Sequence, residues 1–419
     1  MRIISPSSLL FFSLIIWLVL FIISPYNYYF TQDITNATFF LFLSIMCFVI
    51  GANSSFNKER NLYNRLIINT KANSIFKFSL ITGIIGIFLR IYHRIFIEKI
   101  FIFENLTEFR FSALSDFNEP STIEVLSSIM YPFGLTALIF YIYFSDKIKI
   151  NRNVIYLAGI MYPLESLFLG GRITIIVFLS MIFFSLFIKN FHKQKNFLKK
   201  RDILILIFFL FIFSLYSSSV VQARLLTMGF NLLSYIDFLE TQRQVLVSDS
   251  FYNFVDSENF SGLGLYLFII CEIIHYYLVG VIEFIKLFNY NTTYEYWMGA
   301  HQFNVYLKFF SFIGIENLPS FQDTLSSHHH PGQYTSFAGP ALIDFGRFSI
   351  VYFFILGIIS RKIYLDAISN GLVGLMLYPI VATTIVFSPM INLLMAQNLY
   401  ILNSFLFFLL LFKIKIYND

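Results

Sequence analysis

The sequence predicts an all-α, polytopic integral membrane protein with about ten transmembrane helices, an interfacial or re-entrant helical segment and one large external loop. Two observations predict this fold class. The 419 residues are 57% hydrophobic and 13% charged, whereas soluble domains carry about 25% charged residues. Apolar stretches of roughly 17 to 25 residues, which cross a bilayer as helices, recur along the chain. This composition excludes a soluble multidomain enzyme.

The expected spans fall into an N-terminal bundle of about seven helices, residues 1–221, and a C-terminal bundle of about three, residues 346–419. The large external segment, residues 222–345, lies between them. The first apolar run is expected to be an uncleaved span, because no small-residue cleavage site follows it. The expected bounds are 8–24, 37–52, 76–96, 123–144, 154–170, 173–189, 203–221, 346–360, 371–390 and 393–412.

The orientation follows from the basic residues in the short loops, which favour the cytoplasmic side. Placing both termini in the cytoplasm puts most of the 29 basic residues on that side, including those between Lys189 and Arg201. Every cytoplasmic loop is then short, whereas residues 222–345 form one long external segment. We therefore expect the protein to act outside the cytoplasm. Basic residues confined to short loops also argue against a nucleic-acid partner.

Residues 262–288, GLGLYLFIICEIIHYYLVGVIEFIKLF, are apolar enough to cross the membrane but lie inside the external segment. One extra crossing would invert the two sides that the basic residues define. Glu272, His275, Glu283 and Lys286 would also be costly against lipid. We therefore expect an interfacial or re-entrant helix pair here.

Between the fifth and sixth spans, FLGGRITIIVF places a Gly-Gly turn at the outer surface and Arg172 at the edge of the membrane. Arg172 is either a functional cation or an arginine that extends to lipid phosphates. Glu165 lies about 10 Å down the fifth span at 1.5 Å per residue. This intramembrane carboxylate is either functional or paired with a neighbouring helix.

Further arginines are expected at the same depth. Arg90 and Arg94 share a helix face in FLRIYHRIF, Arg224 follows the seventh span, and Arg243 lies further along the external segment. Guanidinium groups bind diphosphates through two parallel hydrogen bonds and stay charged beside a membrane. A lipid-linked diphosphate is therefore the expected partner. Generic interfacial anchoring is the alternative, and it would predict a similar number of lysines on that side.

The segment HHHPGQYTSFAGPALIDFGRF leads into the eighth span. A metal site is not expected, because adjacent histidines in an extended chain point apart and no carboxylate follows at ligand spacing. We expect instead a loop that covers a glycan, with His330 and Tyr334 bonding or stacking on it. Asp344 is either the N-cap of the span or a functional carboxylate, and Arg347 follows it. Cys47 and Cys271 lie in apolar runs and are expected to be buried hydrophobic residues.

These motifs together resemble the Wzy-type O-antigen polymerases, which polymerise oligosaccharide repeat units of bacterial surface polysaccharides. The matching pieces are LGGR at 169–172, Arg224, HYYLVGVIEF at 275–284 and GQYTSFAGPALIDFGRFSIVYFFILG at 332–357. Their order along the chain carries the resemblance, and the triple histidine at 328–330 is not part of the family pattern.

The resemblance implies an inner-membrane glycosyltransferase that acts on undecaprenyl-diphosphate-linked repeat units at the periplasmic face. The growing glycan would pass to an incoming lipid-linked unit, with release of undecaprenyl diphosphate. Arg172 and Arg224 would bind the diphosphate, Arg347 would add a third cation, and Glu165 or Asp344 would act as the base. No metal or cofactor is expected, and a chain-length regulator is a possible partner. The alternatives are an O-antigen ligase, a flippase of lipid-linked sugars and a metal-dependent membrane glycosyltransferase.

Overall fold

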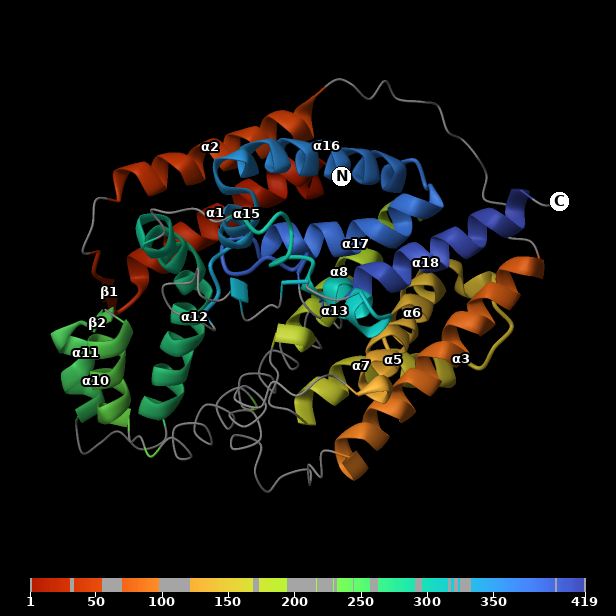
Figure 1. The fold of residues 1–419 in the computed structure, drawn as a ribbon, viewed down its shortest axis with the longest axis horizontal. Helices are drawn as coiled ribbons and strands as arrows, with labels where there is room; N and C mark the ends of the chain where they lie inside the picture. Colours follow the sequence, from red (N-terminus) through yellow and green to blue (C-terminus); the bar gives the residue numbers. More distant parts are fainter. Residues whose placement is uncertain are drawn as a thin grey trace.

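The computed structural model (Figure 1) describes most of the bundle and parts of the segment between its two halves. The described residues are 2–30, 34–54, 70–97, 121–168, 173–193, 216, 229, 232–243, 245–256, 263–290, 296–315, 318–319, 323–324, 333–395 and 398–417.

The N-terminal half is mostly helical in its described part. Its helices are α1 (Pro6–Ile23), α2 (Thr35–Asn53), α3 (Thr70–Tyr92), the π-helical extension η2 (His93–Ile97), α5 (Thr122–Met130), α6 (Phe133–Phe144), α7 (Arg152–Phe168) and α8 (Ile173–His192). Two short 3-10 turns, η1 (Arg2–Ile4) and η3 (Ser145–Lys147), accompany them. The predicted span 123–144 is broken between α5 and α6, at Tyr131 and Pro132. Proline lacks the N–H that would continue the helix.

The second half contains short elements followed by long helices. They are α10 (Leu232–Arg243), α11 (Asp249–Asp256), α12 (Leu263–Tyr290), α13 (Asn304–Phe312), α15 (Ala338–Phe345), the 3-10 turn η4 (Gly346–Phe348), α16 (Ser349–Ile368), α17 (Leu372–Val386) and α18 (Asn398–Tyr417). Two three-residue strands, β1 (Tyr26–Tyr28) and β2 (Val245–Val247), pair antiparallel and were not predicted.

Within the described residues, seven helices are long and apolar enough to cross a membrane, so the chain is a multi-pass membrane protein. They are Pro6–Ile23, Thr35–Asn53, Asn73–Ile97, Thr122–Lys147, Ile173–His192, Leu267–Tyr290 and Ala338–Ile368, with shorter apolar helices at Leu372–Val386 and Asn398–Phe412. The predicted span 154–170 corresponds to the 17-residue helix α7. The predicted span 203–221 falls almost entirely outside the described residues.

The helix pair predicted over 262–288 is wrong, because α12 is one continuous helix of 28 residues. Its first half lies beside β1, at the end of α1, where Tyr26 bonds to Glu272. Its second half packs on the beginning of α2, where Phe288 and Phe40 have ring centroids 5.3 Å apart. Both halves therefore contact the same end of the α1–α2 hairpin, and α12 lies across it (Figure 1).

The polar residues of α12 are buried inside the protein, which explains how they are tolerated. Glu272, His275, Glu283 and Lys286 are each no more than 8% exposed. Lys286 Nζ lies 3.3 Å from Glu283 Oε1, so these two charges form a buried ion pair. Charged side chains are tolerated in a protein interior when they are paired in this way. The expected cost of facing lipid therefore does not arise for these side chains.

The C-terminal bundle packs on the N-terminal bundle through two helix contacts. Helices α2 and α16 cross with their backbones in contact, since a Cβ at Gly51 would overlap the carbonyl oxygen of Phe354 and one at Gly357 would overlap that of Phe48. Small residues permit this close approach in membrane bundles. On the other side, α18 packs on the buried helix α6, where Thr136 and Ser404 hydroxyls lie 2.8 Å apart. Helix α17 lies between these contacts and is mostly buried.

The predicted span 346–360 begins later than expected, at Ser349, and a separate helix, α15, precedes it. Gly346 ends α15 with φ of +54°, a conformation in which side chains are strained. A Cβ there would also overlap the ring of Tyr296. The sequence D-F-G-R-F therefore encodes a sharp break between two helices, at the place where a helix start was predicted.

Candidate functional site

The carboxylate of Asp344 organises a polar cluster at one end of α15. It is fully buried, and its Oδ1 and Oδ2 accept the main-chain N–H groups of His301 and Gln302 at 2.8 and 2.9 Å. Asp344 is therefore not the N-cap of α16, which has no side-chain cap. It instead satisfies the backbone just before α13. A carboxylate held by two main-chain donors is fixed in place, and it fixes the 299–304 turn in return.

The turn that Asp344 holds presents Gln302 to two further polar side chains. Gln302 Oε1 accepts a hydrogen bond from Asn392 Nδ2 at 2.9 Å and one from the Tyr352 hydroxyl at 3.1 Å. Gln302 and Asn392 are both buried. Three segments far apart in sequence thus meet at one amide oxygen: the turn before α13, helix α16 and the loop after α17.

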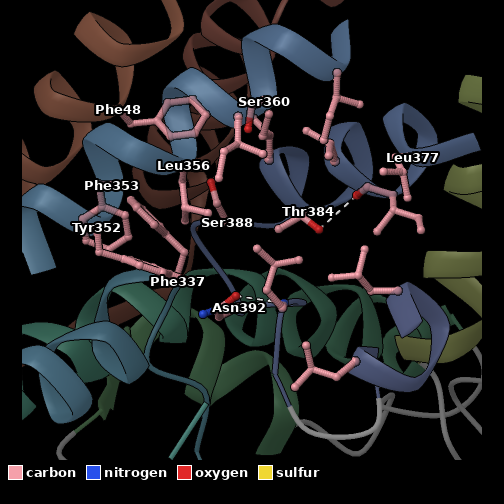
Figure 2. Close-up of a pocket in the computed structure, with 18 of the residues that line it drawn as sticks. Phe48, Phe337, Tyr352, Phe353, Leu356, Ser360, Leu377, Thr384, Ser388 and Asn392 are labelled. Atoms are coloured by element: carbon pink, nitrogen blue, oxygen red, sulfur yellow. Dashed lines mark hydrogen bonds between the residues drawn. The ribbon is translucent and has the colours of Figure 1, made fainter. Parts of the chain in front are cut away.

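An apolar cavity of about 380 Å³ begins at this cluster and lies between α16, α17 and α18 (Figure 2). Tyr352, Asn392 and Ser388 line it together with Phe303 and Phe337 near the cluster. Its remaining lining is almost entirely aliphatic and aromatic. Those further lining residues are Leu10, Phe48, Phe353, Leu356, Ile359, Ser360, Ile363, Leu377, Ile380, Val381, Thr384, Ile385, Leu394, Leu399, Leu402 and Leu406.

The cavity extends along the helices. On α16 its lining runs from Tyr352 to Ile363, which corresponds to roughly 16 Å at 1.5 Å per residue. On α17 it runs from Leu377 to Ile385. A polar end and a long apolar interior suit an amphiphilic ligand, because the chain of such a ligand leaves water while its head group keeps polar partners.

Two buried polar atoms at the cavity end lack hydrogen-bond partners among the described residues. They are the hydroxyl of Ser388, which is 5% exposed, and Nε2 of Gln302. Buried polar atoms are nearly always satisfied, and an orphaned one has a specific reason. The Ser388 hydroxyl is the more informative of the two, because that residue lines the cavity.

Of the predicted site residues near this cluster, Arg347 and Tyr334 take different positions. Arg347 follows the break at Gly346 and is exposed, as is the neighbouring Phe348. Tyr334 is half-buried and packs edge-on against Tyr276 of α12, with centroids 5.4 Å apart. Tyr334 therefore connects α12 to the segment that enters α15, and Arg347 lies on the surface just after α15.

Arg90, predicted to bind substrate, contacts other parts of the protein. It is 3% exposed, donates from Nη1 to Ser128 at 2.8 Å and lies over the Tyr131 ring at 5.6 Å. These contacts join α3 to α5. Both of them stabilise the buried positive charge of Arg90. Arg94 is half-buried in the π-helical turn η2. The structure therefore gives Arg90 a packing role that the i, i+4 pattern did not indicate.

The other predicted site residues fall outside what the structure describes. Arg172, Arg224 and His330 lie outside the described residues, and the side chains of Glu165 in α7 and Arg243 in α10 are also outside the description. The convergence of the predicted arginines therefore stays a prediction.

A second polar cluster, not predicted from the sequence, lies where β1 meets α12. The Tyr26 hydroxyl donates to Glu272 Oε1 at 2.5 Å, and the Tyr28 hydroxyl lies 2.9 Å from His275 Nδ1. Both tyrosine rings pack on the imidazole of His275, with centroids 4.9 and 5.8 Å away. Burial raises the pKa of Tyr28 well above its usual value, so this hydroxyl keeps its proton at neutral pH.

The described residues contain no group of three or more His, Cys, Asp or Glu that would hold a metal ion. Cys47 and Cys271 are free thiols, each half-buried. Comparison with family models, with characterised proteins and with solved structures found no match for the chain.

Proposed function

We propose that this protein is a membrane glycosyltransferase that polymerises undecaprenyl-diphosphate-linked oligosaccharide repeat units into surface polysaccharide, O-antigen or capsule. In this proposal it resides in the bacterial inner membrane with both termini in the cytoplasm. Transfer takes place at the periplasmic face and releases undecaprenyl diphosphate. No metal or cofactor takes part, and a chain-length regulator is a candidate partner.

One observation carries the proposal: the segment that resembles the polymerase family contributes, through its described residues 333–357, to the polar end of a long apolar cavity. Asp344 and Tyr352 belong to this segment, and both contact Gln302. A substrate with a sugar head and a lipid chain needs polar and apolar surfaces side by side at one membrane depth. The cavity and its polar cluster supply that combination, which supports a lipid-linked substrate.

The proposed chemistry needs a base for the acceptor hydroxyl and fixed positive charge for the leaving diphosphate. We assign the positive charge to Arg172 and Arg224, with Arg347 as a further cation at the exposed surface. Both oxygens of Asp344 already accept main-chain hydrogen bonds. We therefore assign Asp344 a positioning role and Glu165 the role of base.

Deletion of the gene, followed by gel analysis of surface polysaccharide, tests the proposed function. A polymerase deletion should collapse the ladder to a single repeat unit on lipid A core. Loss of all glycan on core would instead indicate a ligase or a flippase and contradict the proposal. A flippase is less well supported, because it should line a cavity at the middle of the membrane with polar residues from both halves.

Purified protein and lipid-linked repeat units test the mechanism. Losing one preorganised charge-stabilising group costs about 10²- to 10³-fold in rate, so Arg172→Ala and Arg224→Ala should leave mostly single units. Lys193→Ala, on the predicted cytoplasmic side, is the control and should polymerise normally. Excess EDTA should have no effect. Polymerisation that stops with EDTA and returns with magnesium or manganese would contradict the arginine mechanism.

A further inference from the structure

The cavity between α16, α17 and α18 is too small for an entire long-chain lipid. Its volume of about 380 Å³ lies at the low end of the roughly 300–1,000 Å³ of small-molecule pockets. That is room for part of one hydrocarbon chain. A bilayer phospholipid brings two chains from one head group, and the second would have no place beside the first.

The polar end of the cavity offers hydrogen-bond donors, and no charged side chain is among the residues that line the cavity. The Ser388 hydroxyl is without a partner among the described residues. Asn392 Nδ2 has two N–H groups, of which one bonds to Gln302 Oε1. The Asn392 Oδ1 already accepts the Leu394 N–H at 2.9 Å, so this amide presents its donor side. Donors in a buried site favour the oxygens of a phosphate.

The main-chain structure around these donors fixes their positions. The carbonyl of Ser388 accepts the Phe337 N–H at 2.8 Å, which ties the loop after α17 to the start of α15. Gly280 of α12 packs directly against the carbonyls of Pro389 and Met390. The loop is therefore held on two sides, and a rigid donor pair is better preorganised for a ligand than a mobile one.

We propose that this cavity binds the head-proximal segment of a single polyprenyl chain, with Ser388 and Asn392 donating hydrogen bonds to its phosphate. The rest of the chain extends into the bilayer. This assignment rests on the proposed function for the identity of the chain. The assignment names the residues that hold the lipid. It also predicts that the length of the polyprenyl chain beyond its first isoprene units has little effect on binding.

Substitutions on α17 test the site in detergent-solubilised protein. Thr384 lines the cavity (Figure 2), and Thr384→Phe would fill part of it. Val373 lies on the same helix but is 48% exposed, so Val373→Phe is the matched control. The probes are geranylgeranyl phosphate and dioleoyl phosphatidylglycerol, and binding is measured by titration and by the ligand-induced rise in melting temperature.

Geranylgeranyl phosphate should stabilise the wild-type protein and Val373→Phe, and Thr384→Phe should bind it at least tenfold more weakly. Ser388→Ala removes a hydrogen bond to a charged group and should lower the affinity about tenfold or more. Equal binding by Thr384→Phe and wild type would overturn the proposed site. Phosphatidylglycerol binding as tightly as geranylgeranyl phosphate would overturn the single-chain assignment, and an unchanged affinity in Ser388→Ala would overturn the head-group contact.

The same variants separate this site from the proposed function. If the protein polymerises repeat units while Thr384→Phe retains the wild-type KM, the lipid site is wrong and the function stands. If the wild-type protein binds geranylgeranyl phosphate as described but never polymerises lipid-linked units, the function is wrong and the lipid site stands.

Discussion

The hydroxyl of Tyr26 donates a hydrogen bond to the Glu272 carboxylate at 2.5 Å, and both residues are buried. This bond joins the strand that follows α1 to the first half of α12. Because α12 also contacts Tyr334 and the loop after α17, the bond connects the N-terminal hairpin with the elements around the cavity.

Tyr26→Phe should lower the free energy of unfolding by about 1–3 kcal/mol, because it leaves a buried acceptor without this donor. Tyr29→Phe is the matched control, since Tyr29 is 55% exposed, and it should leave stability unchanged. Thermal unfolding in detergent measures both variants. Equal melting temperatures for the two would show that the hydrogen bond contributes nothing.

The second prediction concerns the stability of variants of the buried ion pair between Glu283 and Lys286. Removing one partner of a buried ion pair typically costs about 3–5 kcal/mol. Glu283→Gln and Lys286→Met should therefore each destabilise strongly, whereas the double variant should recover much of the loss.

The exposed ion pair of Lys193 and Asp146, with Nζ and Oδ2 3.4 Å apart, is the control for this set of single and double variants. A pair in solvent contributes at most about 1 kcal/mol, so Lys193→Met and Asp146→Asn should change little. A double variant at 283 and 286 that is as unstable as the sum of its single variants would contradict the pairing.

Asp344 is predicted to act by positioning Gln302. Asp344→Asn keeps one acceptor oxygen and replaces the other with a donor facing a main-chain N–H. The variant should therefore lower the melting temperature, raise KM and weaken binding of geranylgeranyl phosphate. A catalytic base would instead lose kcat and its pH dependence at unchanged stability. Asp146→Asn, at an exposed position, should change neither stability nor activity.

Membrane topology gives a fourth prediction. Since both halves of α12 contact the same end of the α1–α2 hairpin, its two ends should lie on the same side of the membrane. Alkaline phosphatase fusions after Ser257 and Gln322 should be active, and those after Gln194 and Lys362 should be inactive. An active fusion at Gln194 would invert the topology, and opposite activities at Ser257 and Gln322 would mean that α12 crosses the membrane.

The membrane class and most helix positions followed from the sequence because apolar length is a local property. The spans expected at 8–24, 37–52 and 173–189 correspond closely to α1, α2 and α8. The continuity of α12 did not follow, because the cost assigned to Glu283 and Lys286 depends on whether each has a buried partner. A pair three residues apart on one helix face was the signal available in the sequence.

The polar cluster was less predictable than the fold. Asp344 was singled out, but its partners are main-chain groups near His301, and such contacts leave no side-chain pattern. Gln302 and Asn392 are uncharged residues in segments without a motif, and only their meeting in space gives them a role. The contacts of Arg90 with the Ser128 hydroxyl and the Tyr131 ring could not be derived from the i, i+4 arginine pattern, and its role in substrate binding stays a prediction.

The glycine-lined crossing of α2 and α16 also constrains the order in which the protein matures. Gly51 and Gly357 lie near opposite ends of the chain, so α2 has no partner for this contact until the ribosome has released most of the polypeptide. During synthesis, the surface of α2 around Gly51 is therefore not covered by α16 until that helix has been made. Chains that terminate before α16 would lack this contact, and we expect them to be degraded faster than the full-length chain.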